Sequence, residues 1–309
     1  MAKVATREAY GKALAELAKE NKKILVLDAD LSGSTKTGEV KKETPQQHFN
    51  FGIAEGNMMA AAAGMAASGN IVFASTFAMF ATGRAFEQVR NSIGYPHLNV
   101  KVCATHAGLT VGEDGASHQS VEDISLMRSI PGMVVVTPAD GVETKAAIRA
   151  VAEYEGPCYV RLGRMAVEDV YSEDTIDFTI GKGNIVRKGS KVALVACGIM
   201  VEAALKAADM LKEKGMDVTV VDMHTIKPID EGLLVELSKD HDLIVTCEEH
   251  SVIGGLGSAV AEVLSRKAPT KMAMVGVQDT FGESGTPVAL LEKYGLTPND
   301  IVKAVEENK

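Results

Sequence analysis

Short apolar runs alternate with helical patterns along this sequence, and that alternation constrains the fold more than any other feature. After a helical pattern over residues 6–18, KILVLDAD (23–30) is typical of a buried strand. Four more strand-like runs follow, with helical patterns between them: IVFAST, VKVCAT, MVVVTP and CYVRL. Because strands that alternate with helices pair in parallel and are covered on both faces, the first part of the chain is expected to form a doubly wound α/β domain.

A second α/β domain is expected to follow. Residues 165–190 lose the helical period and gain glycine and charge, which is typical of an interdomain connection. We therefore predict a domain over 1–170, a linker over 171–190 and a domain over 191–309. The strands of the second domain are expected in KVALVAC, DVTVVDM, DLIVTCEE and KMAMVGV, and its helices near Met200, Asp230, Gly257 and Pro287. A length of 309 residues is enough for two such cores.

Composition narrows the class of protein. The formal charge of −9, with acidic and basic residues mixed, argues against a nucleic-acid surface, which needs a basic stripe. The four cysteines stand singly in apolar runs, without the spacing of a zinc site, and are expected to be reduced in a cytoplasm. The N-terminus lacks a signal-peptide pattern, and no run approaches the ~18 apolar residues that cross a membrane. We expect a cytoplasmic protein that binds neither membranes nor nucleic acids.

One long loop concentrates titratable side chains. Open α/β sheets bind ligands beyond the carboxyl ends of their strands, and the loop Thr105–Gln119 leaves such an end. It holds His106, Glu113, Asp114 and His118 among glycines, which suits close approach to a ligand and hydrogen bonding or proton transfer by imidazoles. A solvated glycine-rich loop is the alternative, and the spacing matches no recurrent metal-ligand pattern.

A lone acid, Glu55, stands at the start of the apolar run in FNFGIAEGNMMAAAAGMAASG. Such a glutamate commonly only complements the dipole at the first turn of a helix. The apolar neighbours allow a second interpretation, because a desolvated carboxyl is disfavoured in its charged form and can donate a proton to a ring nitrogen. The residues alone leave both interpretations open.

Two aromatic residues, Phe77 and Phe80, fall three apart just past a predicted strand. Phenylalanines at this spacing are commonly core residues. Their place at the carboxyl end of a strand, in a protein with 5% aromatic residues, also suits a flat platform for an aromatic ring.

Several polar residues are expected at the same edge of the first sheet. Arg7 precedes the first helix, Ser34 lies in the first strand-exit loop, and Arg161 and Arg164 close the last strand. Singly, each would be a surface residue. Brought together by the sheet, planar guanidinium groups would form a bidentate phosphate site.

A glycine-rich turn, GGLGSAV (254–260), follows a strand of the second domain. The G-x-G-x-x-G pattern of a nucleotide site is incomplete there. We interpret the turn as tight packing, with nucleotide binding as the second possibility.

Together these segments resemble the pyrimidine-binding and carboxy-terminal domains of transketolase, over essentially the whole chain. The most specific segments are ATREAYGKAL, FGIAEGNM, STFAMF with RAFEQVR, THAGLTVGEDGASHQ and VDMHTIKPID. The resemblance implies transfer of a two-carbon ketol unit from a ketose phosphate, of the xylulose 5-phosphate type, to an aldose phosphate. It implies thiamine diphosphate as the cofactor, because the acyl carbanion formed in such a reaction needs an electron sink that no side chain supplies.

The resemblance also implies roles for single residues. Glu55 would be the catalytic acid that protonates the aminopyrimidine of the cofactor, Phe77 and Phe80 would wall the pyrimidine, and Asp30 would lie near the thiazolium. The residues expected to face the sugar are His106, Asp114 and His118, and both histidines are also expected to be catalytic. The residues expected to hold the terminal phosphate of the sugar are Arg7, Ser34 and Arg164. One departure from the family pattern is Gly83, an extra residue before Arg84.

A motif expected of the family is missing. Members hold the diphosphate and its Mg²⁺ through a G-D-G motif followed by an asparagine, and no G-D-G occurs in this chain. The resemblance therefore implies an amino-terminal partner subunit that carries G-D-G and the metal, in an α2β2 heterotetramer that is active only when both chains are present. The alternatives are a 2-oxo-acid dehydrogenase β subunit, a deoxyxylulose-phosphate synthase, which normally carries Arg where His106 stands, and a noncatalytic α/β subunit.

Overall fold

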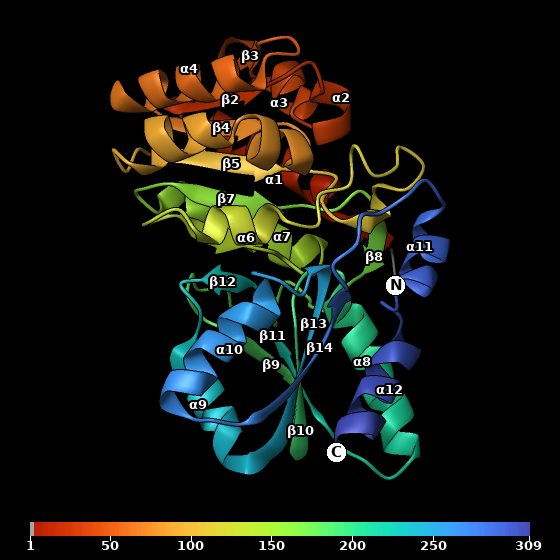
Figure 1. Cartoon of the computed structure of the whole chain (residues 1–309). Helices are drawn as coiled ribbons and strands as arrows, with labels where there is room; N and C mark the ends of the chain where they lie inside the picture. The colour runs from red at the N-terminus through yellow and green to blue at the C-terminus, as the bar shows by residue number, and fades with distance from the viewer. Residues whose placement is uncertain (1–2) are drawn as a thin grey trace.

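The computed structural model describes residues 3–309 and contains two large β-sheets, one built mainly from each half of the chain (Figure 1). A short antiparallel ribbon joins β1 (Lys3–Ala5) to β8 (Ala166–Glu168), so the start of the chain lies beside the segment that leaves the first sheet. A doubly wound α/β unit followed by a second α/β unit was predicted from the alternation of strands and helices, and this fold class is confirmed.

The first sheet has seven strands in the order β12-β6-β7-β5-β4-β2-β3. Its five central strands coincide with the predicted apolar runs and pair in parallel: β2 (Ile24–Asp28), β4 (Ile71–Ser75), β5 (Val100–Ala104), β6 (Val134–Val136) and β7 (Cys158–Arg161). Short β3 (His48–Asn50) extends the sheet beside β2. Because the central strands are parallel, their carboxyl ends share one edge of the sheet.

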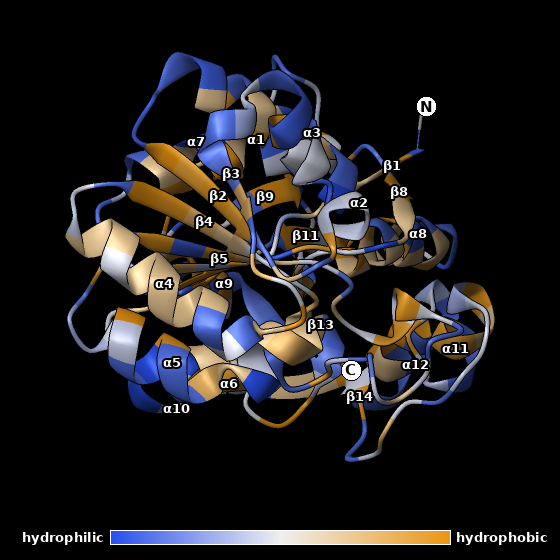
Figure 2. Ribbon diagram, turned by 90° about the horizontal axis from the view of Figure 1, so that it is seen from above, coloured by the Kyte–Doolittle hydropathy of each residue, from blue (hydrophilic) through white to orange (hydrophobic). Residues whose placement is uncertain are grey.

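Helices cover both faces of this sheet. On one face lie α1 (Thr6–Glu20) and α7 (Gly141–Glu153); the other is covered by α4 (Glu55–Ala67) and α6 (Asp123–Arg128). Figure 2 shows the apolar strands β2 and β4 between these layers. Shorter helical segments complete the domain: α2 (Ser32–Thr35), α3 (Gly38–Glu43) and α5 (Phe86–Gln88).

The second sheet has five strands in the order β14-β13-β10-β11-β9. The four predicted strands are β10 (Lys191–Ala196), β11 (Thr219–Asp222), β13 (His241–Ser251) and β14 (Lys271–Val277), and they pair in parallel. The sequence pattern missed the antiparallel edge strand β9 (Asn184–Arg187), which lies inside the expected linker.

The helices of the second unit begin close to the predicted positions: α8 (Met200–Glu213), α9 (Glu231–Asp240), α10 (Leu256–Lys267) and α11 (Pro287–Lys293). The Asp230 side chain caps α9 by accepting the Leu233 N–H at 3.0 Å. A further helix, α12 (Pro298–Asn308), packs beside α8 and begins with a capping box between Thr297 and Asp300.

The two halves of the chain share a sheet. β12 (Thr225–Lys227) belongs to the second half by sequence, yet it pairs antiparallel with β6 and forms one edge of the first sheet. Lys227 strengthens this junction, because its Nζ donates to the Arg128 and Ile130 carbonyls at 2.7 and 2.5 Å. The interface between the halves therefore includes backbone pairing as well as side-chain packing.

Candidate functional site

The residues predicted from the sequence lie in segments that leave the carboxyl edge of the first sheet. Each segment follows a different strand, so the parallel sheet brings together positions far apart along the chain. Asp30 and Ser34 follow β2, Glu55 follows β3, Phe77 and Phe80 follow β4, His106 to His118 follow β5, and Arg164 follows β7.

Glu55 is the first residue of α4, and only 3% of its side chain is exposed. Both interpretations of this residue apply to its position, since the carboxylate is at the helix N-terminus and is also buried. Its partner is Arg84, whose Nη1 donates to both carboxylate oxygens, at 3.0 and 3.1 Å. A buried carboxylate with one charged partner is suited to exchanging that partner for another hydrogen-bonding group.

The extra residue Gly83 is absorbed by a wider turn of helix. Residues Phe80–Arg84 form a π-helical turn (η2), which accommodates one more residue than an α-turn. A Cβ at position 83 would lie 2.4 Å from the Met79 methyl carbon, so a larger residue there would require the flexible Met79 side chain to move. The turn places the Arg84 guanidinium 4.4 Å from the centre of the Phe80 ring, over its face.

Phe77 and Phe80 lie almost parallel, with ring centres 5.9 Å apart and an interplanar angle of 12°. The His106 imidazole stacks on Phe77 at 3.9 Å, and the His118 imidazole meets Phe80 edge-on at 5.3 Å. The loop histidines and the strand-exit phenylalanines therefore form one aromatic cluster beside the Glu55–Arg84 pair.

His106 is the most electrostatically perturbed member of this cluster. Burial, followed by the charges of Arg7, Arg164 and His118, lowers the pKa of His106 to about 3. Its Nδ1 lies 2.9 Å from the Thr105 hydroxyl oxygen. The imidazole is consequently neutral near pH 7, with one nitrogen able to donate and one able to accept a hydrogen bond.

The two arginines expected to hold a phosphate both approach this histidine. The Arg7 Nη1 donates to the backbone carbonyl of Ser34 at 2.9 Å, and burial lowers the Arg7 pKa. Arg164 donates to the Val111 carbonyl and contacts the Glu113 carboxylate at 3.2 Å. The charges of Arg7 and Arg164 act on one another and on His106, so the fold gathers positive charge at this end of the site.

The remaining predicted residues lie at the margin of the cluster. Asp30 is exposed and adopts a left-handed conformation with φ of 63°. Its backbone N–H donates to the Asn50 side-chain oxygen at 3.2 Å, and its carboxylate accepts from the Asn50 amide at 3.5 Å. Asp114 is exposed in the Thr105–Gln119 loop. Neither carboxylate has a described contact with Glu55 or the phenylalanines, and their roles stay predictions.

Arg161 differs from the expectation of a surface residue that contributes to phosphate binding. Its side chain is 6% exposed, and its Nε donates to the Asp123 carboxylate at 2.7 Å. Tyr159 donates to the same carboxylate at 2.6 Å. Arg161 also reaches the Glu249 carbonyl at 2.9 Å, which makes it part of the junction between the two halves of the chain. The expected surface position was wrong because residue 161 is the last residue of a buried strand.

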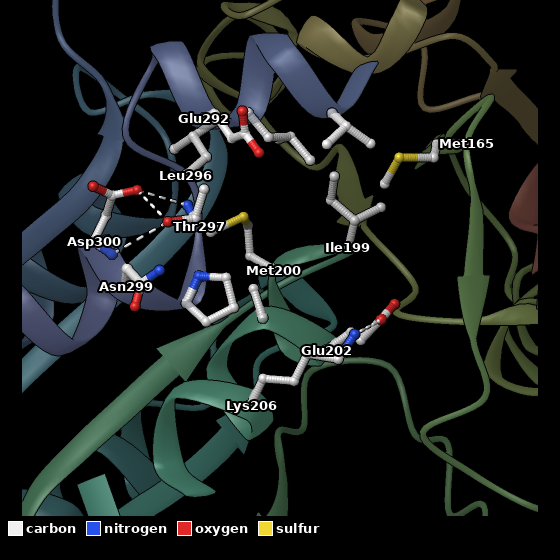
Figure 3. Close-up of a pocket in the computed structure, with 14 residues that line it drawn as sticks. Met165, Ile199, Met200, Glu202, Lys206, Glu292, Leu296, Thr297, Asn299 and Asp300 are labelled. Carbon is white, nitrogen blue, oxygen red and sulfur yellow. Dashed lines mark hydrogen bonds and ion pairs between the residues drawn. The ribbon is translucent and has the colours of Figure 1, made fainter. Parts of the chain in front are cut away.

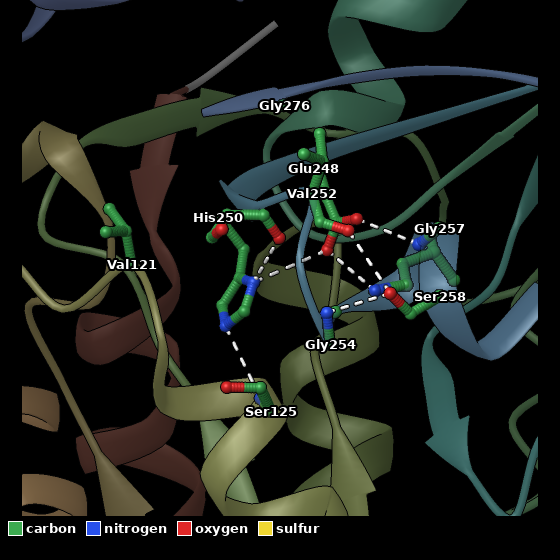
Figure 4. A network of polar contacts seen from close by, with 12 residues as sticks. Val121, Ser125, Glu248, His250, Val252, Gly254, Gly257, Ser258 and Gly276 are labelled. Atoms are coloured by element: carbon green, nitrogen blue, oxygen red, sulfur yellow. Dashed lines mark hydrogen bonds and ion pairs between the residues drawn. The ribbon is translucent and has the colours of Figure 1, made fainter. Parts of the chain in front are cut away.

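The glycine-rich turn before α10 encloses an acid of the protein itself. The Glu248 carboxylate accepts the N–H groups of Leu256 and Gly257 at 2.6 and 2.8 Å, and a Cβ on Gly255 would lie 2.0 Å from it (Figure 4). Glu248 thus occupies the position at the helix N-terminus where a phosphate group binds in nucleotide sites. The interpretation of this turn as tight packing agrees with the structure.

Nothing in the sequence indicated the role of Arg84, or the residues that hold the loop Thr105–Gln119, called here the histidine loop, in place. Beneath that loop, Thr110 donates its backbone N–H to the Glu249 carboxylate at 2.6 Å, and Gln119 donates to the Glu283 carbonyl at 2.9 Å. Consecutive acids at the end of a strand, CEEH, were the available signal. These acids could not be recognised as support for the loop from the sequence, because the contact between Glu249 and Thr110 joins the two halves of the chain.

A cavity of about 590 Å³ lies elsewhere, between α8, α11 and α12 (Figure 3). Ile199, Met200 and Leu296 give it an apolar wall, and Glu202 and Lys206 lie at its side. It contains none of the predicted site residues. The cluster at the sheet edge is therefore separate from this cavity.

Two features are absent from the described part of the chain. Within residues 3–309, no three His, Cys, Asp or Glu side chains are grouped in a way that could hold a metal ion. Over the same range, none of the helices combines the length and apolar character that crossing a membrane requires.

Comparison with known families gives two matches in order along the chain. The model described as "Transketolase, pyrimidine binding domain" matches residues 2–169, and the model described as "Transketolase, C-terminal domain" matches residues 181–301. Together they cover nearly the whole sequence.

Individual relatives are also named as transketolases or as parts of them. A protein of Methanocaldococcus jannaschii named as a transketolase C-terminal section is 52% identical over 303 residues, covering 97% of this chain and 95% of that protein. One of the subunits of the apulose-4-phosphate transketolase of Phocaeicola vulgatus is 37% identical, covering 98% and 97%. Human transketolase is 36% identical over 307 residues, and the match covers 98% of this chain and 49% of that longer protein.

A solved structure described as a split-gene transketolase, inactive beta4 tetramer, superposes with a TM-score of 0.93 at 58% identity, covering 99% of this chain and 98% of the other. The fold and the composition of the sheet edge define a two-domain α/β protein of the pyrimidine-binding class. The chain belongs to the transketolase family, whose enzymes depend on thiamine diphosphate.

Proposed function

We propose that this chain is the carboxy-terminal subunit of a split transketolase. Together with an amino-terminal subunit, it would transfer a two-carbon ketol unit from a ketose phosphate of the xylulose 5-phosphate type to an aldose phosphate. The observation that carries the proposal is the buried Glu55 carboxylate beside an aromatic cluster that includes the neutral His106.

The cluster fits the pyrimidine end of thiamine diphosphate. Phe77 and Phe80 offer the flat apolar surface that an aromatic ring needs, and Glu55 offers one carboxylate for a ring nitrogen. When bound, the cofactor supplies the electron sink for carbon–carbon bond cleavage. Glu55 would hold a proton at the pyrimidine nitrogen, and Asp30 would lie toward the thiazolium side.

The proposed sugar site lies along the histidine loop. Neutral His106 can donate and accept hydrogen bonds, so it would orient the substrate hydroxyls and move protons together with His118, with Asp114 beside them. Arg7 and Arg164 would bind the terminal phosphate, together with Ser34, because two guanidinium groups converge there. The alternative with Arg in place of His106, as in deoxyxylulose-phosphate synthase, would supply another cation rather than a neutral imidazole.

The partner would supply the other end of the cofactor. We propose that it carries the G-D-G motif and Mg²⁺, and that two copies of each chain form an α2β2 assembly in the cytoplasm. Support comes from the relative named as a C-terminal section and from the neighbouring structure, a β4 tetramer described as inactive. We also propose that residues 1–170 and 191–309 are the two domains, joined by 171–190.

Relatives of this chain are named for different ketose substrates. One relative, from a Clostridium species, is named as a 6-deoxy-6-sulfo-D-fructose transketolase subunit and is 41% identical, and another acts by its name on apulose 4-phosphate. A panel of ketose donors with phosphate or sulfonate ends should therefore be compared. We expect xylulose 5-phosphate to have the highest kcat/KM.

The deciding experiment mixes this chain with a purified amino-terminal subunit. Transketolase activity should appear only in the mixture, should require thiamine diphosphate and a divalent metal, and should accompany a mass near two copies of each chain by light scattering. Robust activity of this chain alone would contradict the split-enzyme proposal. Lipoyl acylation without ketol transfer would favour the 2-oxo-acid dehydrogenase alternative, and cofactor binding without turnover of any donor would favour a noncatalytic subunit.

A further inference from the structure

Two consecutive acids at the end of β13 serve different halves of the molecule. Adjacent side chains of a strand point in opposite directions. Glu248 points to the N-terminus of α10 in its own half, whereas Glu249 points across the junction to the loop Thr105–Gln119. Glu249 is 3% exposed, so this contact lies in the interior of the protein.

The Glu249 carboxylate lies directly against the backbone of the histidine loop. One oxygen accepts the Thr110 N–H at 2.6 Å. Gly108 has φ of 80°, and a Cβ on it would lie 2.3 Å from the Glu249 carboxyl carbon. The loop can follow this path only with glycine at position 108, because any side chain there would overlap the acid.

Other contacts from the second half hold the far end of the same loop. Gln119 donates to the Glu283 carbonyl at 2.9 Å, and a Cβ on Gly115 would lie 2.5 Å from the Ser284 hydroxyl oxygen. The loop therefore rests on the second half at two points, one near His106 and one near His118. Its position depends on a domain that contributes no side chain to the predicted sugar site.

We infer that Glu249 is a positioning residue, which fixes the histidine loop by accepting the Thr110 N–H and thereby sets how His106 and His118 meet the sugar. Burial raises the pKa of Glu249 to about 7, opposed by Arg161. A buried acid in such surroundings is costly unless it is hydrogen-bonded, which gives the contact with Thr110 a physical reason. The kinetic part of this inference rests on the proposed function; the structural part does not.

Two variants of similar size separate hydrogen bonding from packing. Glu249→Met fills the same space without an acceptor, whereas Glu249→Gln keeps a carbonyl oxygen for the Thr110 N–H. Glu236→Met, on the exposed side of α9, is the control for a surface substitution. The full-length chain is used for hydrogen exchange, and its complex with the amino-terminal subunit is used for kinetics.

Hydrogen exchange measured by mass spectrometry should show slow exchange of the Thr110 amide in the wild type. Exchange in peptides spanning 105–119 should become at least tenfold faster in Glu249→Met, stay within threefold in Glu249→Gln, and be unchanged in α4 peptides. Fast exchange of Thr110 in the wild type, or equal behaviour of the Met and Gln variants, would overturn the inference. If the Glu249→Met variant does not fold, the exchange rate of the Thr110 amide in the wild type tests the inference: slow exchange supports it and fast exchange overturns it.

In the complex, Glu249→Met should raise KM for the ketose phosphate at least tenfold and leave thiamine diphosphate affinity within twofold, while Glu249→Gln should resemble the wild type. Equal losses of sugar and cofactor binding would mean a general structural role and overturn the inference. An inactive wild-type complex would instead refute the proposed function, and the exchange measurement would still test Glu249.

Discussion

Arg84 and Glu55 form an ion pair in which one guanidinium nitrogen contacts both carboxylate oxygens, at 3.0 and 3.1 Å. The two side chains differ in exposure, with 53% of Arg84 and 3% of Glu55 open to solvent. The same guanidinium lies over the Phe80 ring. A pyrimidine ring that used both Phe80 and Glu55 would have to share or displace these contacts of Arg84.

Replacing Glu55 with Gln tests its role as the activating acid. In the complex with the amino-terminal subunit, proton exchange at the thiazolium carbon of the cofactor should slow by at least ~100-fold, because an amide cannot supply the proton. NMR of the bound cofactor measures this rate. Glu87→Gln, which changes an exposed acid close by, is the control and should exchange normally. Normal exchange in Glu55→Gln would contradict the assignment.

Removing the partner of Glu55 should destabilise the folded chain. Arg84→Met leaves a buried carboxylate without its charged donor, and we expect a loss of about 1 kcal/mol after discounting for the exposure of the arginine. Urea denaturation measures the free energy of unfolding. Arg90→Met is a matched control, because Arg90 bonds the exposed Asn91 side chain and should change stability by less than about 0.5 kcal/mol. Equal effects of the two substitutions would show that the Glu55 contact contributes nothing.

Arg7 and Arg164 should contribute to the binding of phosphorylated donors but not to the binding of donors without a phosphate. Arg7→Ala and Arg164→Ala should each weaken binding of phosphorylated sugars by about 10- to 100-fold, since a charge-assisted contact contributes roughly 1.5 to 3 kcal/mol. Steady-state kinetics in the complex gives KM for each donor. Hydroxypyruvate, which has no phosphate, should be affected by less than about threefold. A similar loss for both donors would make these arginines structural.

The pKa of His106, lowered to about 3, predicts a pH dependence with a definite sign. Between pH 6.5 and 3 the unfolded chain binds a proton at this residue and the folded chain does not, so this group lowers stability as the pH falls through that range and has no effect above it. NMR spectra of the imidazole nitrogens should stay constant from pH 5 to 8. A titration midpoint near 6.5 would refute a neutral His106.

The strands of both sheets could be predicted because they are continuous apolar runs, as in KILVLDAD and KVALVAC. The strands β3, β9 and β12 could not, since His48–Asn50 is short and mixed in polarity and both Asn184–Arg187 and Thr225–Lys227 are short strands at an edge. The same distinction applies to the site. Local motifs indicated Glu55 and the histidine loop, but the burial of Arg161 and the support from Glu249 depend on contacts between residues far apart in sequence.

The π-helical turn at Phe80–Arg84 shows why motif spacing alone was insufficient. An extra residue in a helix normally rotates everything after it by about 100° relative to what precedes it. A wider turn absorbs Gly83 locally, and the side chain that follows reaches Glu55. The departure from the family pattern was visible in the sequence, whereas the resulting contact was visible only in the fold.

The pairing of β12 with β6 has a consequence for synthesis of the chain. The ribosome synthesises the N-terminal part of the chain first. Thr225 pairs with Val136 in the folded protein but emerges about 90 residues later. During that interval the nascent first sheet has an open edge at β6, and unpaired edges attract other strands. The hazard is limited because β6 is short, Val134–Val136. Translation that stopped before Thr225 would leave this edge permanently open and the fragment prone to aggregation.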